Sequence, residues 1–465
     1  MGARLVIFAL LTGAQAVAQT GDWIATLAFG SAKLRLALHL AARPGGQVAA
    51  TADSIDQNAF GLKVARVESR GSGLRFTVPR LGGRFSGSFS EDGAALAGTW
   101  TERQGSLPMR FARGNIRPQE PAPPYPYDSG DVVFHNGAVR LAGILTLPRT
   151  PGPHPAVILL SGSGPQDRNE TSAGHRPFLV WSDYLTRRGF AVLRMDDRGV
   201  GRSTGRLLDS TDEDFAADAL AAVEFLKGRK EIDPRRIGLL GYSEGGGVAA
   251  LAAQHSAGVA FVALLAGPAV RGEQILFAQS ERIARAMGVP EEVAAKSRDV
   301  QRKLFEIARQ GGPGERQRME AVLARETDWL TPEAAAAILG QVGGQIPLAS
   351  SRWFRFVLDF DPGPALARIQ CPVLALYGGL DLQVPADLDA PAMEKALAAN
   401  PNHKVLTLSR LNHMFQTAAT GSPLEYSQIE ETVAPLALKA VGDWMASTAG
   451  GRFAPPVAWG PQENR

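Results

Sequence analysis

A serine between small residues follows a short apolar run near the middle of the chain. Residues 241–245 read Gly-Tyr-Ser-Glu-Gly, and residues 237–240, Ile-Gly-Leu-Leu, are typical of a buried strand. A serine hydroxyl becomes a nucleophile when a base takes its proton and a sharp strand-to-helix turn holds its oxygen clear of the backbone. Small flanking residues relieve the crowding of such a turn. We therefore predict Ser243 as a nucleophile, the alternative being an ordinary glycine-rich turn.

The general base must reach Ser243 from elsewhere in the chain, and His413 is the best placed of the seven histidines. It follows a strand-like run at 404–408, and loops at the carboxyl ends of parallel strands converge on one edge of a sheet. His403 precedes the same run, so we expect it at the opposite edge. Other histidines fall on or beside predicted helices or in the N-terminal region: His175, His255 and His39.

Asp381 is the predicted acid that orients the histidine. It follows an apolar run at 374–377 and a pair of glycines. A buried carboxylate in this position holds the imidazole tautomer and stabilises the imidazolium that forms when serine gives up its proton. Asp387 and Asp389 are the alternatives, but they fall in the next loop or at the start of the next helix.

Two backbone N–H groups are needed to stabilise the oxyanion of acyl transfer. Glu244 follows the nucleophile and supplies the first. The glycine-rich turn at 160–165 (Leu-Ser-Gly-Ser-Gly-Pro) supplies the second, with Ser163 preferred and Gly164 next. The alternative for this turn is an ordinary strand-to-helix loop.

Charged residues near these motifs have roles that the sequence leaves open. Asp167 and Arg168 either bind substrate or pin the glycine-rich turn. Residues 196–199, Asp-Asp-Arg-Gly, follow another apolar run, and an arginine–carboxylate pair there would brace the site.

The elements that must position these residues fall into two regions. Residues 20–115 alternate polar and apolar positions with turn residues about every ten, which predicts an antiparallel β domain, either a sandwich or a small barrel. A proline-rich linker is expected at 116–129. From 130 to 448, apolar strands alternate with helices, which predicts a mostly parallel sheet covered on both faces.

Residues 271–365 interrupt this alternation with helices, predicted at 273–287, 291–310 and 332–339. An insertion of this kind between two sheet strands has the position of a lid over an active site. A final helix is predicted from Ser427 to about Ala446, followed by a tail at 449–465. Aromatic residues of the insertion, Trp329 and Trp353 among them, are expected to be core residues.

The first 18 residues have a basic start, a short apolar run and Ala16-Val17-Ala18, a pattern that predicts a cleaved signal peptide and export to the periplasm or the medium. We expect no stable membrane insertion after cleavage. The net charge of +3 comes from scattered residues, so we expect no nucleic-acid partner. We find no metal-binding spacing or phosphate loop and expect neither metal nor cofactor. One cysteine, Cys371, excludes an intrachain disulfide, and oligomeric state is not readable.

Together these motifs resemble the secreted bacterial α/β-hydrolases related to serine aminopeptidase-like and prolyl-oligopeptidase-like esterases. The matching stretches are residues 161–168, 195–201, 241–245, 377–384 and 412–416. The order Ser, Asp, His along the chain is also that of the α/β-hydrolases. One departure is Ser161-Gly162, where many members of the superfamily have His-Gly in the oxyanion loop.

The resemblance implies hydrolysis of a small-molecule carboxylic ester through an acyl-serine intermediate. A peptidase or amidase would use the same three residues on a peptide-like substrate, because only the leaving group differs. A third hypothesis is a binding protein. In such a protein the N-terminal domain would capture a ligand, and the hydrolase fold would serve as an inactive scaffold. The presence of nucleophile, base and acid together argues against that reading.

Overall fold

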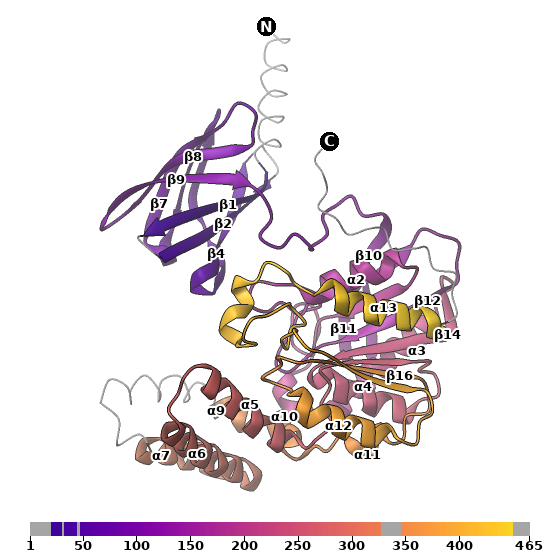
Figure 1. Cartoon of the computed structure of the whole chain (residues 1–465). Coiled ribbons are helices and arrows are strands. Elements are labelled where there is room, and N and C mark those ends of the chain that lie inside the picture. The colour runs from indigo at the N-terminus through magenta and orange to yellow at the C-terminus, as the bar shows by residue number, and fades with distance from the viewer. Residues whose placement is uncertain (1–19, 30–31, 44–46, 327–345, 450–465) are drawn as a thin grey trace. The chain divides into compact units, whose positions relative to one another are not determined.

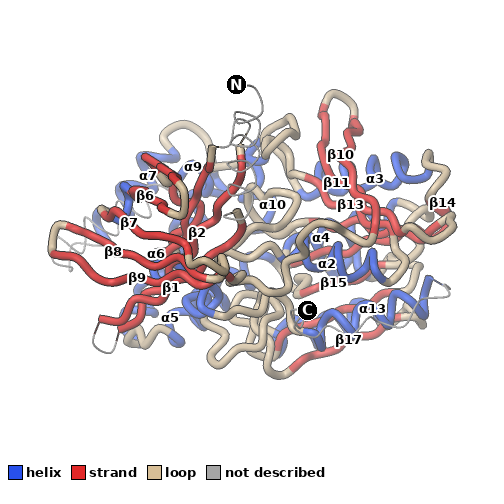
Figure 2. The backbone as a smooth tube through the Cα atoms, turned by 90° about the horizontal axis from the view of Figure 1, so that it is seen from above, coloured by secondary structure: helices blue, strands red, loops and turns tan. Residues whose placement is uncertain are grey.

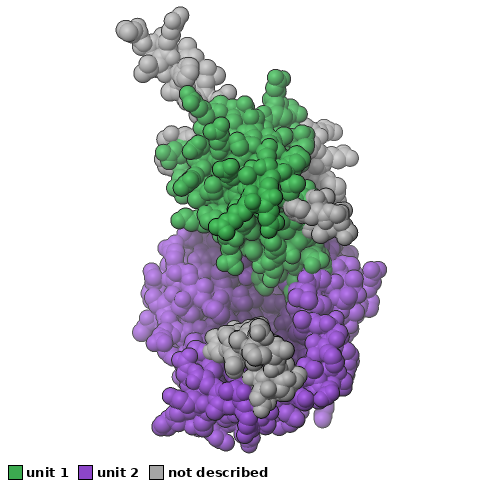
Figure 3. Space-filling model, turned by 90° about the vertical axis from the view of Figure 1, so that its left-hand side faces the viewer, with its two compact units in different colours: residues 1–118, 172–175, 426–430 green, residues 119–171, 176–425, 431–465 purple. Residues whose placement is uncertain are grey.

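The chain divides into two compact units (Figure 3), each with a large hydrophobic core of its own. The computed structural model describes residues 20–29, 32–43, 47–326 and 346–449. Unit 1 comprises the chain up to Pro118 together with Ser172–His175 and Tyr426–Glu430, and unit 2 comprises the rest. The predicted signal peptide and residues 450–465 of the predicted tail lie outside the described residues.

Unit 1 is a nine-stranded antiparallel sheet in the order β4-β3-β2-β1-β9-β8-β7-β6-β5. Its strands are β1 (Gly21–Phe29), β2 (Ala32–Ala42), β3 (Val48–Ser54), β4 (Ala59–Lys63), β5 (Ala65–Arg70), β6 (Gly73–Val78), β7 (Gly83–Phe89), β8 (Ala95–Glu102) and β9 (Gly105–Arg113). Alternate residues face inward, as Leu74, Phe76 and Val78 do on β6. Leu62, near one edge of the sheet, and Leu74, near the other, share one core, so the sheet curls around it. This confirms the predicted antiparallel β domain, as one curled sheet rather than a two-sheet sandwich.

Unit 2 is built on an eight-stranded sheet in the order β10-β11-β13-β12-β14-β15-β16-β17 (Figures 1 and 2). Its strands are β10 (Tyr127–Asn136), β11 (Val139–Pro148), β12 (His154–Leu160), β13 (Ala191–Met195), β14 (Ile232–Tyr242), β15 (Val262–Leu265), β16 (Val373–Gly378) and β17 (His403–Leu408). β10 pairs antiparallel with β11, and β11 with β13, whereas all later pairings are parallel. The fold class predicted from the sequence is confirmed. β10 also begins inside the segment predicted as a linker.

Helices cover both faces of this sheet. α2 (Pro177–Arg187) packs against α13 (Pro435–Ala449), and α3 (Asp212–Lys227) packs against α4 (Glu244–His255) (Figure 1). α12 (Ala386–Leu397) covers β16 and β17. The prediction that the last helix begins at Ser427 is wrong. The Gln119 side chain accepts the N–H groups of Thr432 and Val433, so this backbone is held outside the helix, which starts at Pro435.

Six described helices lie between β15 and β16, where the helical insertion was predicted. They are α5 (Gly272–Ala286), α6 (Glu291–Gln310), α7 (Glu315–Glu326), α9 (Ile346–Ala349), α10 (Arg352–Asp359) and α11 (Gly363–Leu366). Phe305, Met319 and Leu358 form part of a small core of their own. The helix predicted at 332–339, and Trp329, lie outside the described residues. Among helices in the described ranges, none combines the length and hydropathy needed to cross a bilayer.

Candidate active site

Ser243 occupies a sharp turn between β14 and α4. Its backbone has φ 54° and ψ −123°, a left-handed conformation that strains a residue other than glycine. A Cβ on Gly241 would lie 2.1 Å from the carbonyl oxygen of Gly245, and one on Gly245 would lie 2.4 Å from that of Leu160. The two flanking glycines are therefore required by backbone contacts, as the motif predicted, and the turn projects the serine from the end of the strand.

His413 lies in the loop after β17, with its ring beside the serine. Its Nε2 is 3.1 Å from Ser243 Oγ, and the residue is 5% exposed. The side chains of Asn412 and Gln416 bond to each other, and the Gln416 N–H donates to Asn412 Oδ1 at 2.9 Å. These bonds close a tight loop, so the imidazole is held in place by the backbone on both sides.

Asp381 completes the chain of contacts from the loop after β16. Its Oδ2 is 2.8 Å from His413 Nδ1. Its Oδ1 accepts the N–H groups of Gln383 at 2.7 Å and Val384 at 2.9 Å. The carboxyl is thus buried with three N–H groups around it, an arrangement that fixes the orientation of the imidazole.

The alternative acids and histidines lie elsewhere. Asp389 accepts the Ala269 N–H at 2.8 Å, and Asp387 pairs with Arg282. His403 contacts Glu394, and the remaining alternatives bond to other partners: His175 to the Tyr426 carbonyl, His255 to Gln254, and His39 to Asp22 and Asp53. The structure therefore brings together Ser243, His413 and Asp381 rather than the alternatives.

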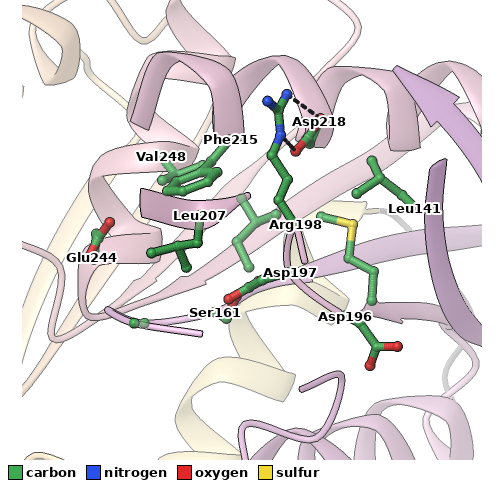
Figure 4. A pocket seen from close by; sticks show the side chains of 14 residues that line it. Leu141, Ser161, Asp196, Asp197, Arg198, Leu207, Phe215, Asp218, Glu244 and Val248 are labelled. Carbon is green, nitrogen blue, oxygen red and sulfur yellow. Dashed lines mark hydrogen bonds and ion pairs between the residues drawn. The ribbon is translucent and has the colours of Figure 1, made fainter. Parts of the chain in front are cut away.

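Ser163 and Gly164, the two candidates for the second oxyanion donor, line different cavities. Ser163 and Glu244 line a cavity of about 110 Å³ together with Ser243. Gly164 lines a smaller cavity of about 40 Å³ with Asp197 and Glu244 (Figure 4). Glu244 is the first residue of α4, where backbone N–H groups have no partner within the helix. This arrangement favours Ser163 over Gly164 as the second donor.

The carboxyl groups of Asp197 and Glu170 accept hydrogen bonds from the glycine-rich turn at 160–165. Asp197, which lies beside Ser161 in Figure 4, accepts a hydrogen bond from the Ser161 hydroxyl. It accepts another, at 2.9 Å, from the Gln166 N–H. Both oxygens of Glu170 lie 3.3 Å from the Gly162 nitrogen, which donates to them. Burial raises the pKa of Asp197 to about 7, and burial and the neighbouring Asp197 raise that of Glu170 well above its usual value. The role of Glu170 was not predicted from the sequence.

The charged residues whose roles the sequence left open are structural. Arg168 makes a two-pronged contact with Asp196, with Nε–Oδ1 at 2.9 Å and Nη2–Oδ2 at 2.5 Å. Asp167 accepts N–H groups of its own loop, from Asn169 and Thr171. Asp196 therefore pairs with Arg168, in the loop after the glycine-rich turn, whereas Arg198 pairs with Asp218. Asp167 holds the conformation of that same loop.

The larger cavity beside Ser243 is mainly apolar. Its wall is formed by residues after β15, by the insertion and by the loop after Asp381; the apolar members are Pro268, Val270, Ile275, Leu276, Val357, Phe360, Pro362 and Val384. Gln279 bonds to Gln383 at 3.3 Å, which joins α5 to the loop after Asp381. An apolar pocket next to a nucleophile suits the carbon chain of an acyl group.

The side chain of Glu244 contributes a feature that the sequence did not predict. Its Oε1 accepts the indole N–H of Trp353, on α10, at 2.6 Å. Its carboxyl lines the same cavity as that of Asp212, the first residue of α3, and the two interact electrostatically. The sequence signal for this side chain was limited to the position of an acidic residue directly after the nucleophile. In the described ranges, no group of three or more His, Cys, Asp or Glu side chains is arranged to hold a metal ion.

Several known proteins are similar to this chain. The sequence profile of the family described as serine aminopeptidase, S33, matches residues 178–318. Esterase EstD of Thermotoga maritima is 26% identical over 330 residues, which cover 70% of this chain and 70% of EstD. Human protein ABHD12B is 39% identical over 101 residues, covering 22% of this chain and 25% of that protein. The Pyrococcus furiosus esterase Pf2001 is similar at a TM-score of 0.45 and 16% identity, covering 70% of this chain and 92% of that structure.

The strand order and the strained turn at Ser243 are those of the α/β-hydrolase fold, and the similar proteins support hydrolase activity. The protein is a hydrolase with this fold, and an antiparallel β domain precedes the part of the chain that carries it.

Proposed function

We propose that this hydrolase is an esterase that uses Ser243, His413 and Asp381 as a catalytic triad. The observation that carries the proposal is the continuous pair of contacts from Ser243 Oγ to His413 Nε2 at 3.1 Å and from His413 Nδ1 to Asp381 Oδ2 at 2.8 Å. Nucleophile, base and orienting acid in this geometry are the requirements of acyl transfer.

In the first half-reaction, Ser243 Oγ attacks the ester carbonyl carbon while its proton passes to His413 Nε2. The carbonyl oxygen becomes an oxyanion, which accepts hydrogen bonds from the backbone N–H groups of Glu244 and Ser163. When the carbonyl re-forms, the bond to the alcohol breaks and His413 returns the proton to the leaving oxygen. The acyl group, now on Ser243, occupies the apolar cavity.

In the second half-reaction, water takes the place of the alcohol. His413 removes a proton from water, the resulting hydroxide attacks the acyl carbon, and the proton then returns to Ser243 as the acid leaves. Asp381 stabilises the imidazolium in both halves.

The apolar wall of the cavity and the similarity to EstD support an ester rather than a peptide substrate. Peptide hydrolysis is the second candidate, because the matching profile is described as that of serine aminopeptidases. A panel of acyl esters and aminoacyl arylamides tests the two. We expect turnover of the esters, and arylamide turnover at a comparable rate would replace the proposal with the second candidate.

Covalent labelling tests the nucleophile directly. A fluorophosphonate probe is expected to label the wild-type protein and not Ser243→Ala. Ser297→Ala is the control, because Ser297 is exposed on α6 and its hydroxyl donates to the Val293 carbonyl of the same helix. Equal labelling of Ser243→Ala and wild type would exclude Ser243.

We also propose export of the protein with cleavage after Ala18, on the strength of the N-terminal pattern alone. Expression in a bacterium with fractionation, and mass analysis of the mature N-terminus, tests this. Full-length protein in the cytoplasmic fraction would contradict it.

A further inference from the structure

The carboxyl groups of Glu244 and Asp212 line the same cavity. Glu244 Oε2 and Asp212 Oδ1 are buried, and no N–H or O–H group of the described residues donates to either atom. The two carboxyls also interact electrostatically, each disfavouring the charge of the other. Two buried anions without donors are costly in free energy, which favours a proton on one of them.

The remaining contacts show where the two carboxyls lie. Glu244 Oε1 accepts the Trp353 N–H, whereas Glu244 Oε2 has no donor among the described residues. Both residues line the cavity that contains Ser243, and Glu244 is also the residue whose backbone N–H we assign to the oxyanion. The pair therefore joins the start of α4 to the start of α3 and to α10 of the insertion.

We propose that Glu244 and Asp212 share a single proton, so that the pair carries one negative charge rather than two. The protonated pair holds the backbone N–H of Glu244, the oxyanion donor, in position. The inference rests on the proposed function, because it gives the Glu244 N–H a role in the reaction. In this scheme Glu244 and Asp212 are positioning residues. They act on the reaction through the backbone of α4 and through their charge, and neither exchanges a proton with substrate.

Charged groups around the pair increase the cost of losing its proton. Asp197 and Glu170, behind the glycine-rich turn, and Glu213, next to Asp212, are the acids that interact electrostatically with it. α10 contributes the uncharged Trp353, and its neighbour Arg352 lies 3.9 Å from Asp214 rather than at the pair. Burial raises the pKa of Asp212 to about 7 and that of Glu244 well above its usual value, in agreement with a shared proton.

The consequence is a loss of activity as pH rises. When the pair loses its proton, two anions repel each other at the start of α4 and oppose the developing oxyanion. Glu244→Gln removes the loss of the shared proton at high pH. The glutamine amide N–H donates to Asp212, its carbonyl accepts from Trp353, and the pair stays at one negative charge. Asp212→Asn removes this loss as well, because the pair then never exceeds one negative charge.

The experiment is the pH dependence of kcat and KM, from about pH 5 to about pH 10, for ester hydrolysis by the full-length protein. We expect wild-type kcat to fall about tenfold at alkaline pH from the added charge, and the fall to be absent in Glu244→Gln and Asp212→Asn. Glu224→Gln is the control, because Glu224 is an exposed carboxylate on the same helix as Asp212. It should keep the wild-type profile.

Trp353 gives a second readout that does not depend on turnover. Its fluorescence, taken as the difference between wild type and Trp353→Phe, should change at the same pH as kcat, because the indole N–H faces the titrating carboxyl. A wild-type profile without an alkaline fall, or the same fall in a folded Glu244→Gln or Asp212→Asn protein, would overturn the proposal. Failure of the proposed function is recognised separately, by labelling of Ser243→Ala.

Discussion

Asp381, at the end of β16, and the acids near β12 and β13 lie on the two sides of β14 in the sheet. Asp381 is 4% exposed and accepts from two backbone N–H groups while facing the ring nitrogen of His413. Glu170 shares one N–H between two oxygens, and Glu244 faces another acid. The number of donors, more than burial, distinguishes Asp381 from Glu170 and Glu244.

The largest loss of activity is expected from substitution of Asp381. Asp381→Asn keeps the shape of the site but favours the wrong imidazole tautomer, so kcat should fall about 10³- to 10⁴-fold. Asp387→Asn is the matched control, because Asp387 is exposed and pairs with Arg282. Steady-state kinetics measure both. A loss of less than about tenfold in Asp381→Asn would remove Asp381 from the triad.

The turn that holds Ser243, flanked by Gly241 and Gly245, should be nearly as sensitive to substitution. In Gly245→Ala the new Cβ would lie 2.4 Å from the Leu160 carbonyl, so the serine must move, and we expect kcat/KM to fall about 100-fold or more. Gly130→Ala is the control, since its Cβ meets no atom within 4 Å. Fluorophosphonate labelling and circular dichroism separate displacement of Ser243 from unfolding. Wild-type labelling of Gly245→Ala would show that the turn tolerates the contact.

A smaller loss of activity is expected from substitution of Asp197, which accepts hydrogen bonds from the glycine-rich turn and the loop after it. Asp197→Ala leaves the Ser161 hydroxyl and the Gln166 N–H without their acceptor, and we expect kcat/KM to fall about tenfold. Asp197→Asn should recover most of the loss, because its carbonyl accepts from Gln166 and its amide donates to the serine oxygen. Equal rates for the alanine and asparagine variants would mean that the charge, rather than the hydrogen bonds, matters.

The smallest effect concerns stability. The pKa of Glu170 is higher in the folded than in the unfolded chain, so its contribution is fully present below the unfolded pKa and is lost as pH rises towards the folded pKa. Glu170→Gln has no proton to lose and can still accept the Gly162 N–H. Its melting temperature relative to wild type should therefore rise steadily from about pH 5 to about pH 8. A constant difference across this range would contradict the assigned protonation.

Much of this architecture is readable from the sequence, because each part rests on local pattern. Alternation predicts the strands of unit 1, and the strand-serine-helix pattern predicts the turn at Ser243. The end of an apolar run predicts where Asp381 and His413 emerge, and parallel strands bring such ends to one edge.

The acids around Glu244 and the glycine-rich turn were not predictable in the same way. Asp212 comes from α3, which packs against α4, and Trp353 comes from α10 of the insertion. Their separation from Glu244 along the chain carries no signal. Glu170 is one of many acids in loops, and its burial depends on the Gly162 N–H that it accepts. The start of α13 was misplaced because distant Gln119 decides it.

Unit 1 is made from three separate stretches of the chain, and Arg117 joins them. Its guanidinium donates to the carbonyls of Gly174, Ile429 and Ser427 at 3.0, 2.6 and 2.8 Å. Cutting the chain after Pro118 would leave these oxygens without their donor, so the N-terminal part cannot be removed as a detachable module. Any experiment on the role of the β domain should therefore alter its surface and keep Arg117 in place.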